Sequence, residues 1–172
     1  MAKKYFLDMD GVLAKWEDFD IPVDEMQQPG FFRNLEPCTH MVEAVRELVK
    51  DGEDVNILSA VFNQSGIEEK QAWLDEHLPE IPREKRLFTQ CGEDKCQVLE
   101  GMESRNDAVL IDDYSKNLLA WQEAGGAGIK FMNSLNAVQG TWTGDFLFWR
   151  TDPRQLATTI EAIAHKDELQ QL

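Results

Sequence analysis

Residues 4–16 read KYFLDMDGVLAKW, and this stretch decides how the chain begins to fold. Its apolar residues Tyr5 to Leu7 have the composition of a short buried strand, and they run directly into Asp8 and Asp10, which precede Gly11. Because alternate residues of a strand share a face, these two carboxylates lie side by side, where their like charges repel. The stretch therefore predicts a compensating positive charge at the end of the first strand.

Length and composition indicate one acidic domain. The 172 residues are 42% hydrophobic, which suits a single core, so residues 1–172 are expected to form a single domain. The 32 acidic and 17 basic residues give a net charge of −15. Such a surface repels nucleic-acid polymers and anionic membranes, which excludes both as partners. A small anionic substrate would need a metal ion or local cations at its site.

The cysteines and the amino-terminal sequence favour a cytoplasmic protein. Cys38, Cys91 and Cys96 are odd in number and have neither disulfide-like nor zinc-site spacing, so we expect free thiols in a reducing compartment. The apolar run that Asp8 interrupts is too short for a signal peptide. No apolar window approaches the length that spans a membrane.

Apolar strand-like runs alternate with amphipathic helical patterns along the chain. The expected strands are residues 5–8, 55–59, 86–89, 108–112 and 128–132, and the expected helices are 39–50, 66–79, 115–126 and a last one that follows Asp152-Pro153. Phe146 and Phe148 alternate with other residues as in a late or edge strand. This alternation predicts an α/β fold of three layers, a parallel sheet with helices on both faces.

Residues 15–37 interrupt this pattern directly after the first strand. The segment is polar and broken by prolines, yet it carries four aromatic residues, Trp16, Phe19, Phe31 and Phe32. It is therefore predicted to form a small lid. The aromatic residues either pack the lid against the domain or stack on a substrate.

Polar side chains stand at the carboxyl ends of the predicted strands, where open parallel sheets bind their ligands. The first strand delivers the aspartate pair, the second delivers Ser59, the fourth delivers Asp112 and Asp113, and a nearby helix start offers Lys95. Carboxylates from two strands form a hard-oxygen site that suits Mg²⁺ completed by a phosphate oxygen. The predicted metal ligands are Asp8, Asp10, Asp112 and Asp113.

Such a site is suited to phosphoryl transfer. One aspartate of the pair can attack phosphorus, because an aspartyl-phosphate divides a slow hydrolysis into two easier steps. The other aspartate can protonate the leaving oxygen and then activate water. A lysine and a hydroxyl group hold the phosphoryl oxygens. Lys70 and Lys85 compete with Lys95 for this part.

The ordered motifs resemble those of the haloacid dehalogenase superfamily of phosphohydrolases. Their sequences DMDGVLA, FFRNLEPCTHMVEAV, KQAWLDEHLP, EDK and LIDDYSKN are similar to the branch that contains the 5′(3′)-deoxyribonucleotidases. The resemblance extends to about Asn133. It implies a Rossmann-like core with a minimal cap, although the lid is much shorter than in the animal enzymes.

The resemblance also implies roles for individual residues. Asp8 would be the nucleophile, and Asp10 would be the acid and base and a metal ligand through its backbone carbonyl. Asp112 and Asp113 would complete the Mg²⁺ site. Ser59 and Lys95 would bind phosphate, while Trp16, Phe31 and Phe32 would stack on the base of a nucleoside monophosphate. Asn117 either orients a neighbour of the metal site or caps a helix.

Three functions remain open at this point. The first is a Mg²⁺-dependent 5′-(deoxy)nucleotidase, and the second is a phosphatase of a sugar phosphate or another small metabolite. The third is a phospho-acceptor module without turnover, which would place its acceptor after a middle strand and not after the first. The absence of a G-x-x-x-x-G-K-[ST] motif excludes a P-loop ATPase.

Overall fold

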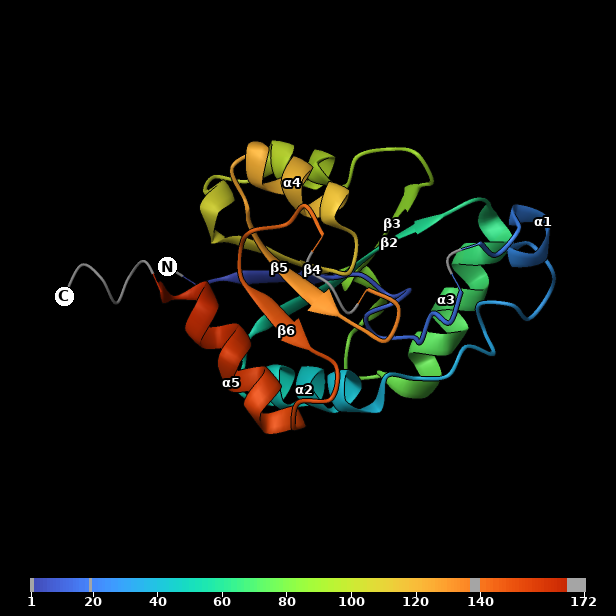
Figure 1. Cartoon of the computed structure of the whole chain (residues 1–172), viewed down its shortest axis with the longest axis horizontal. Coiled ribbons are helices and arrows are strands. Elements are labelled where there is room, and N and C mark those ends of the chain that lie inside the picture. The colour runs from blue at the N-terminus through green and yellow to red at the C-terminus, as the bar shows by residue number, and fades with distance from the viewer. Residues whose placement is uncertain (1, 19, 137–139, 167–172) are drawn as a thin grey trace.

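The computed structural model describes residues 2–18, 20–136 and 140–166, and its centre is one parallel sheet (Figure 1). The sheet has six strands in the order β3-β2-β1-β4-β5-β6, and every neighbouring pair is parallel. In chain order the strands are β1 (Lys4–Leu7), β2 (Asp54–Val61), β3 (Arg86–Gln90), β4 (Ala108–Asp112), β5 (Ala127–Met132) and β6 (Phe146–Phe148). The predicted α/β fold with a parallel sheet is confirmed.

Helices cover both faces of the sheet. They are α1 (Val23–Met26), α2 (Thr39–Lys50), α3 (Gln64–His77), α4 (Ser115–Glu123) and α5 (Pro153–Ala164), with short 3₁₀ helices at Arg83–Lys85, Lys95–Gly101 and Arg105–Asp107. In Figure 1, α2 and α5 lie side by side on one face and α4 lies on the other. Two hydrophobic clusters fill the space between these layers, one on each side of the sheet.

The helix positions follow from the apolar patterns of the sequence. Helix α2 buries Met41, Val45 and Leu48, whose spacing predicted one apolar face. Helix α5 begins as expected, because the Asp152 carboxylate accepts hydrogen bonds from the backbone N–H groups of Arg154 and Gln155. The late segment also forms the expected edge strand, β6.

The predicted apolar face of helix α3 is confirmed in part, since Leu74 and Leu78 are buried. The pattern placed Ile67 on the buried side, but Ile67 is only partly buried in the structure. Lys70 and Trp73 are both fully buried instead. Lys70 can be buried because its ammonium group donates hydrogen bonds to Asp10, Ser59 and the Ala60 carbonyl.

The segment predicted as a lid runs beside α3 at one end of the molecule (Figure 1). Its backbone is held by Glu69, whose carboxylate accepts from the N–H groups of Gly30 at 2.6 Å and Phe32 at 3.0 Å. The Trp73 indole adds a bond of 2.8 Å to the carbonyl of Leu35. Phe19 lies outside the described residues.

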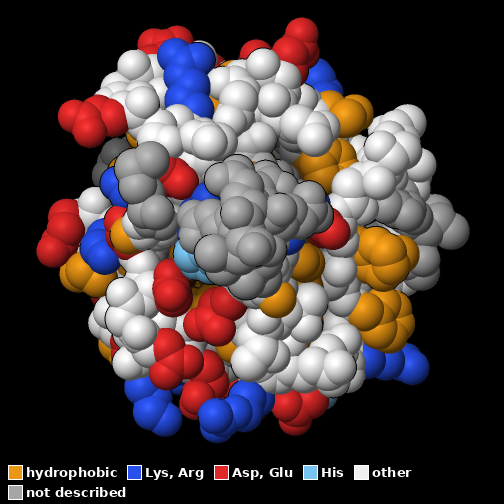
Figure 2. All heavy atoms as spheres, turned by 90° about the vertical axis from the view of Figure 1, so that its left-hand side faces the viewer, with side chains coloured by type: hydrophobic (Ala, Val, Ile, Leu, Met, Phe, Trp, Pro, Cys, Tyr) orange, Lys and Arg blue, Asp and Glu red, His pale blue; other side chains and the backbone are white. Residues whose placement is uncertain are grey.

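The face of the molecule near the amino ends of the strands carries charges of both signs. Figure 2 shows that acidic and basic side chains are interspersed on this face. Within residues 2–18, 20–136 and 140–166, no helix is long and apolar enough to cross a bilayer.

Candidate active site

The ends of β1 and β4 bring the predicted carboxylates together. The two strands are neighbours in register, with Leu7 opposite Ile111, and the Asp8 N–H donates to the Ile111 carbonyl at 3.0 Å. Asp8, Asp112 and Asp113 therefore leave the same edge of the sheet. One carboxylate oxygen from each of these three residues lies within 4.8 Å of the others.

A tight turn after Asp8 shapes the site. The N–H groups of Val12, Leu13 and Ala14 all point at the Met9 carbonyl, at 3.1, 2.9 and 2.9 Å. Gly11 has φ of +80°, a left-handed conformation that favours glycine. This turn brings the Gly11 backbone against the Asp113 carboxylate.

Lys95 supplies the positive charge that the carboxylates require. It begins the 3₁₀ helix Lys95–Gly101, and its buried Nζ lies 2.9 Å from Asp8 Oδ1 and 2.7 Å from Asp112 Oδ2. Burial opposes its charge, but the carboxylates of Asp112 and Asp8 raise the pKa of Lys95 above its usual value. Its competitor Lys85 instead pairs at 2.9 Å with Asp54, at the opposite end of the sheet.

The carboxylates themselves are under electrostatic strain. Burial raises the pKa of Asp8 to about 6, with Lys95 opposing the shift and Asp112 adding to it. Burial, followed by the charges of Asp112 and Asp8, also raises the pKa of Asp113 well above its usual value. One lysine therefore leaves the negative charge of this cluster only partly balanced.

Asp112 and Asp113 differ in how many hydrogen bonds they already accept. Asp112 is fully buried, and it accepts from the Tyr114 N–H at 2.8 Å, from Asn117 Nδ2 at 3.0 Å and from Lys95. Asn117 therefore helps to orient the Asp112 carboxylate, which is the first of the two roles considered for Asn117. Asp113 is partly exposed and accepts from Asn133 Nδ2 at 3.1 Å, so it has more room for a further ligand.

The Asp10 side chain pairs with Lys70 and is not part of the three-carboxylate group. Its Oδ2 accepts a hydrogen bond of 2.7 Å from Lys70 Nζ, and a quarter of the side chain is exposed. The structure thus separates the first aspartate pair, with Asp8 at the three-carboxylate group and Asp10 beside α3. The predicted metal contact through the Asp10 backbone carbonyl stays a prediction.

Ser59 lies beside Lys70 and is fully buried. Strand β2 continues two residues past Ser59 to Val61, because it pairs with β3, but its pairing with β1 ends at Ile57. Ser59 therefore lies beyond the end of β1, where Lys70 Nζ donates to its Oγ at 2.9 Å.

The sequence offered Lys70 only as a competitor of Lys95 for phosphate binding, and its contacts with Asp10 and Ser59 were missed. A signal was present, since Lys70 lies on the same helix face as Trp73 and Leu74, and a lysine at such a position needs a polar partner. Asn133, which joins Asp113 to the Gly11 carbonyl at 2.8 Å, was also missed. It follows β5 and carries no recognisable spacing signal.

The predicted aromatic residues pack against one another. The Trp16 ring lies 5.7 Å from Phe31 and 6.5 Å from Phe32, and Phe31 and Phe32 are 5.1 Å apart, all between ring centroids. Phe32 is buried, and its centroid lies 4.5 Å from Lys70 Nζ. Trp16 and Phe31 are only partly buried.

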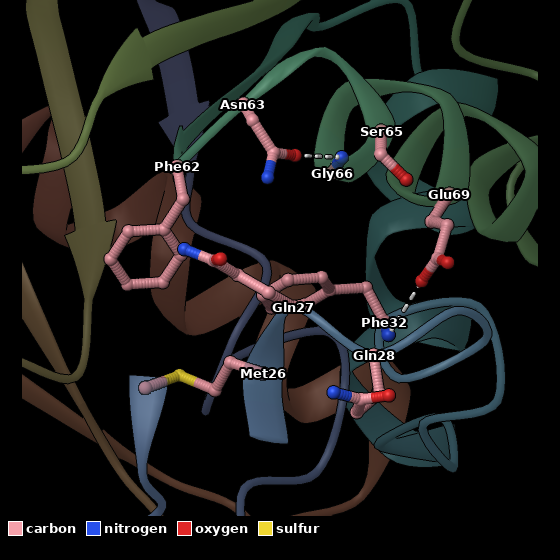
Figure 3. A pocket seen from close by; sticks show the side chains of 9 residues that line it. All are labelled: Met26, Gln27, Gln28, Phe32, Phe62, Asn63, Ser65, Gly66 and Glu69. Atoms are coloured by element: carbon pink, nitrogen blue, oxygen red, sulfur yellow. Dashed lines mark hydrogen bonds between the residues drawn. The ribbon is translucent and has the colours of Figure 1, made fainter. Parts of the chain in front are cut away.

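Two cavities flank this part of the molecule. The first lies between α1 and the start of α3, where Met26, Gln27 and Gln28 face Phe62 and Asn63 (Figure 3). The second, of about 170 Å³, lies on the β5 side, and its lining includes Gly11, Trp16, Asn133 and Trp149. Phe32 lines the first cavity and Trp16 lines the second.

Most of the chain matches the model of a known protein family. Residues 17–142 match the model of the family described as 5′ nucleotidase, deoxy (pyrimidine), cytosolic type C protein. The chain belongs to this deoxynucleotidase family. The match includes Ser59, Lys95, Asp112 and Asp113 and begins after Asp8 and Asp10.

Two relatives carry the name "Putative 5'(3')-deoxyribonucleotidase". The protein from Staphylococcus epidermidis is 29% identical over 118 residues, which cover 68% of this chain and 58% of that protein. The protein from Bordetella pertussis is 38% identical over 63 residues, 36% of this chain and 34% of that protein. The chain therefore spans less than two thirds of the length of these relatives.

Solved structures agree on the fold. A D,D-heptose 1,7-bisphosphate phosphatase from Burkholderia thailandensis superposes with a TM-score of 0.63 at 14% identity, covering 93% of this chain and 99% of that one. The corresponding phosphatase from B. bronchiseptica, complexed with magnesium and phosphate, gives 0.61 at 14% identity over 92% and 98%. The predicted Rossmann-like α/β fold with a parallel sheet is confirmed.

Proposed function

We propose that this protein is a Mg²⁺-dependent phosphomonoesterase that hydrolyses nucleoside monophosphates, as a 5′-(deoxy)nucleotidase. The observation that carries the proposal is the group of Asp8, Asp112 and Asp113 around Lys95 at the carboxyl edge of a parallel sheet. Membership of a deoxynucleotidase family supports the substrate class. The free cysteines support a cytoplasmic location.

The carboxylate group fits a magnesium ion. Its three oxygen donors lie within 4.8 Å of one another, and the raised pKa values of Asp8 and Asp113 indicate that another cation would be favourable there. Asp8 and Asp113 would hold the ion, with Asp112 oriented beside them by Asn117 and Lys95. When bound, Mg²⁺ neutralises these carboxylates and polarises a phosphoryl oxygen.

Hydrolysis proceeds in two steps on residues of this chain. An Asp8 carboxylate oxygen attacks phosphorus, forming a new P–O bond while the bond to the leaving oxygen breaks. Protonated Asp10 gives its proton to that oxygen, which leaves as the nucleoside hydroxyl. Asp10 then takes a proton from water, whose oxygen attacks the aspartyl-phosphate and releases inorganic phosphate and the free Asp8 carboxylate.

Ser59 and Lys95 stabilise the transferring phosphoryl group. The Lys95 ammonium already lies against Asp8, so it is near the position that phosphorus must occupy for attack. The Ser59 hydroxyl accepts from Lys70, which leaves its own proton for a phosphoryl oxygen. Trp16, Phe31 and Phe32 then lie on the lid side and supply aromatic surface to a nucleobase.

The decisive experiment is a panel of nucleoside monophosphates and sugar phosphates assayed at fixed Mg²⁺. We expect multiple turnovers on nucleotides, silence in excess chelator, and loss of turnover in Asp8→Asn with the fold intact. Asp107→Asn is the matched control, because Asp107 is a buried aspartate paired with Lys3 away from the site. A preference for sugar phosphates would contradict the substrate class. A stoichiometric burst without turnover would instead indicate a phospho-acceptor module.

A further inference from the structure

Among the described residues near the site, Lys70 is a buried lysine whose ammonium group has a hydrogen-bond acceptor for each of its protons. Its side chain is fully buried, and its Nζ donates to Asp10 Oδ2 at 2.7 Å, to Ser59 Oγ at 2.9 Å and to the Ala60 carbonyl at 2.8 Å. An ammonium has three protons, so each proton has one acceptor. The Phe32 ring covers a further side at 4.5 Å.

Burying the Lys70 ammonium costs desolvation free energy, so its position indicates that its contacts have a role. A buried lysine must be paired and hydrogen-bonded, and an apolar residue of similar size would pack beside Trp73 at no such cost. Its acceptors come from two parts of the chain, the turn after β1 and the end of β2, and the Phe32 ring adds a contact with a third part, the lid segment. Lys70 therefore fixes these parts relative to one another.

The direction of each hydrogen bond has a chemical consequence. The Ser59 oxygen accepts from the ammonium, so the Ser59 hydroxyl proton must point toward a different acceptor. Asp10 Oδ2 is occupied in the same way, which leaves Oδ1 of the partly exposed carboxylate for proton exchange. Both side chains are thus oriented before any substrate binds.

We propose that Lys70 is a positioning residue of the phosphatase reaction, which holds the Asp10 carboxyl group in place, so that its protonated form can give its proton to the leaving oxygen, and holds the Ser59 hydroxyl for phosphate binding. The inference rests on the proposed function and deepens it. The groups that Lys70 contacts are the Asp10 carboxyl group and the Ser59 hydroxyl. Its effect is transmitted through Asp10 and Ser59.

The test uses Lys70→Met and two kinds of leaving group. Proton transfer to the leaving oxygen matters for a nucleoside monophosphate, whose alkoxide is a poor leaving group, and matters little for p-nitrophenyl phosphate. Single-turnover release of the leaving group isolates the first chemical step. We expect a fall of about 100-fold or more for the nucleotide and of less than about 10-fold for the aryl ester, as for partial loss of a general acid.

Three further variants make the comparison specific. Lys3→Met is the matched control, because Lys3 is a buried lysine that pairs with Asp107 at the opposite end of the sheet. It should change the melting temperature without a leaving-group bias. Lys70→Arg keeps the charge and should show a smaller loss with the same bias. In Lys70→Met combined with Asp10→Asn, the losses on the nucleotide should not multiply, since both act through one carboxylate.

The outcomes separate this inference from the proposed function. If the wild-type protein releases no phosphate, the proposed function fails. If the wild type is active but Lys70→Met slows both substrates equally, or the two losses multiply, the positioning role is refuted. Should Lys70→Met not fold, the leaving-group comparison is made on Lys70→Arg, where an equal loss on both substrates has the same meaning.

Discussion

A Cβ atom at Gly11 would lie 2.1 Å from the Asp113 carboxylate oxygen Oδ2, so any other residue at this turn would have to displace that carboxylate. The contact joins the two strand ends that carry the carboxylates of the candidate site. The Asn133 amide completes it, because Nδ2 donates to both the Gly11 carbonyl and Asp113.

Gly11→Ala should therefore disable the enzyme more than it destabilises the fold. The methyl group must displace the Asp113 carboxylate, and a displacement of about 1 Å can cost about 100-fold in rate. Gly52→Ala is the matched control, since Gly52 has φ of +90° with no atom within 4 Å of a Cβ. It should lose only about 1 to 2 kcal/mol of stability. Equal activities of the two variants would contradict this role of the contact.

Asp113→Asn should stabilise the metal-free protein while weakening its response to Mg²⁺. The raised pKa of Asp113, caused first by burial, means that its charged form disfavours the folded state, so a neutral amide should raise the melting temperature. Each kcal/mol corresponds to about 2 to 4 °C in a chain of this size. In the wild type, Mg²⁺ at 100 times its Kd should add about 2.7 kcal/mol.

Differential scanning fluorimetry with and without Mg²⁺ checks this prediction. Asp107→Asn is the control, because Asp107 pairs with Lys3 and should lose stability while keeping the full Mg²⁺ shift. An Asp113→Asn protein that keeps the wild-type shift would exclude Asp113 as a metal ligand.

Trp16→Ala should lose activity selectively on nucleotides. Trp16 is partly exposed beside Phe31 and borders the cavity on the β5 side, so it has aromatic surface free for a base. Stacking on such a ring contributes about 1 to 3 kcal/mol per base, which corresponds to a decrease in kcat/KM of about 5- to 150-fold. Sugar phosphates should be hydrolysed at nearly the wild-type rate.

Phe148→Ala is the control for Trp16→Ala. Phe148 is 43% exposed on β6 and should affect neither substrate class. Equal losses of Trp16→Ala on nucleotides and sugar phosphates would mean that Trp16 only packs the lid segment.

Tyr5→Phe should be neutral or stabilising near pH 7 and should reduce the loss of stability in alkali. The Tyr5 hydroxyl is buried near Glu53 and makes no hydrogen bond of normal geometry among the described residues. Burial, followed by the charges of Glu53 and Glu161, raises the pKa of Tyr5 far above its usual value. Above about pH 10 only the unfolded state releases this proton, so the wild type should lose up to about 1.4 kcal/mol per pH unit.

Urea unfolding of the wild type and Tyr5→Phe at pH 7, 10 and 11 measures this difference. The free energies of unfolding should diverge as the pH rises above 10. Parallel curves would show that Tyr5 ionises in the folded protein as easily as in the unfolded chain.

The fold was accessible from the sequence because its signals are local. Helix α2 has an apolar face of regular spacing, and Asp152-Pro153 starts α5 through a cap that depends on neighbouring residues. The face of α3 was predicted less well. Periodicity alone treats Lys70 as a solvent-facing residue, and only its distant acceptors make its burial favourable.

Part of the candidate site could also be predicted from local sequence signals. The strand pattern was enough to place Asp8, Asp10, Ser59 and Asp112 near the carboxyl ends of parallel strands. Strand direction and side-chain alternation both follow from short stretches of chain. Their meeting in space follows from the strand order, with β1 between β2 and β4.

The division of these groups into two sets follows from contacts between distant parts of the chain. Asp8 joins Asp112, Asp113 and Lys95, whereas Asp10 turns to Lys70, although the two aspartates are two residues apart. The division depends on charges that are brought close by folding from α3 and from the 3₁₀ helix at Lys95. A buried charge takes the partner nearest in space, and sequence spacing does not encode that distance.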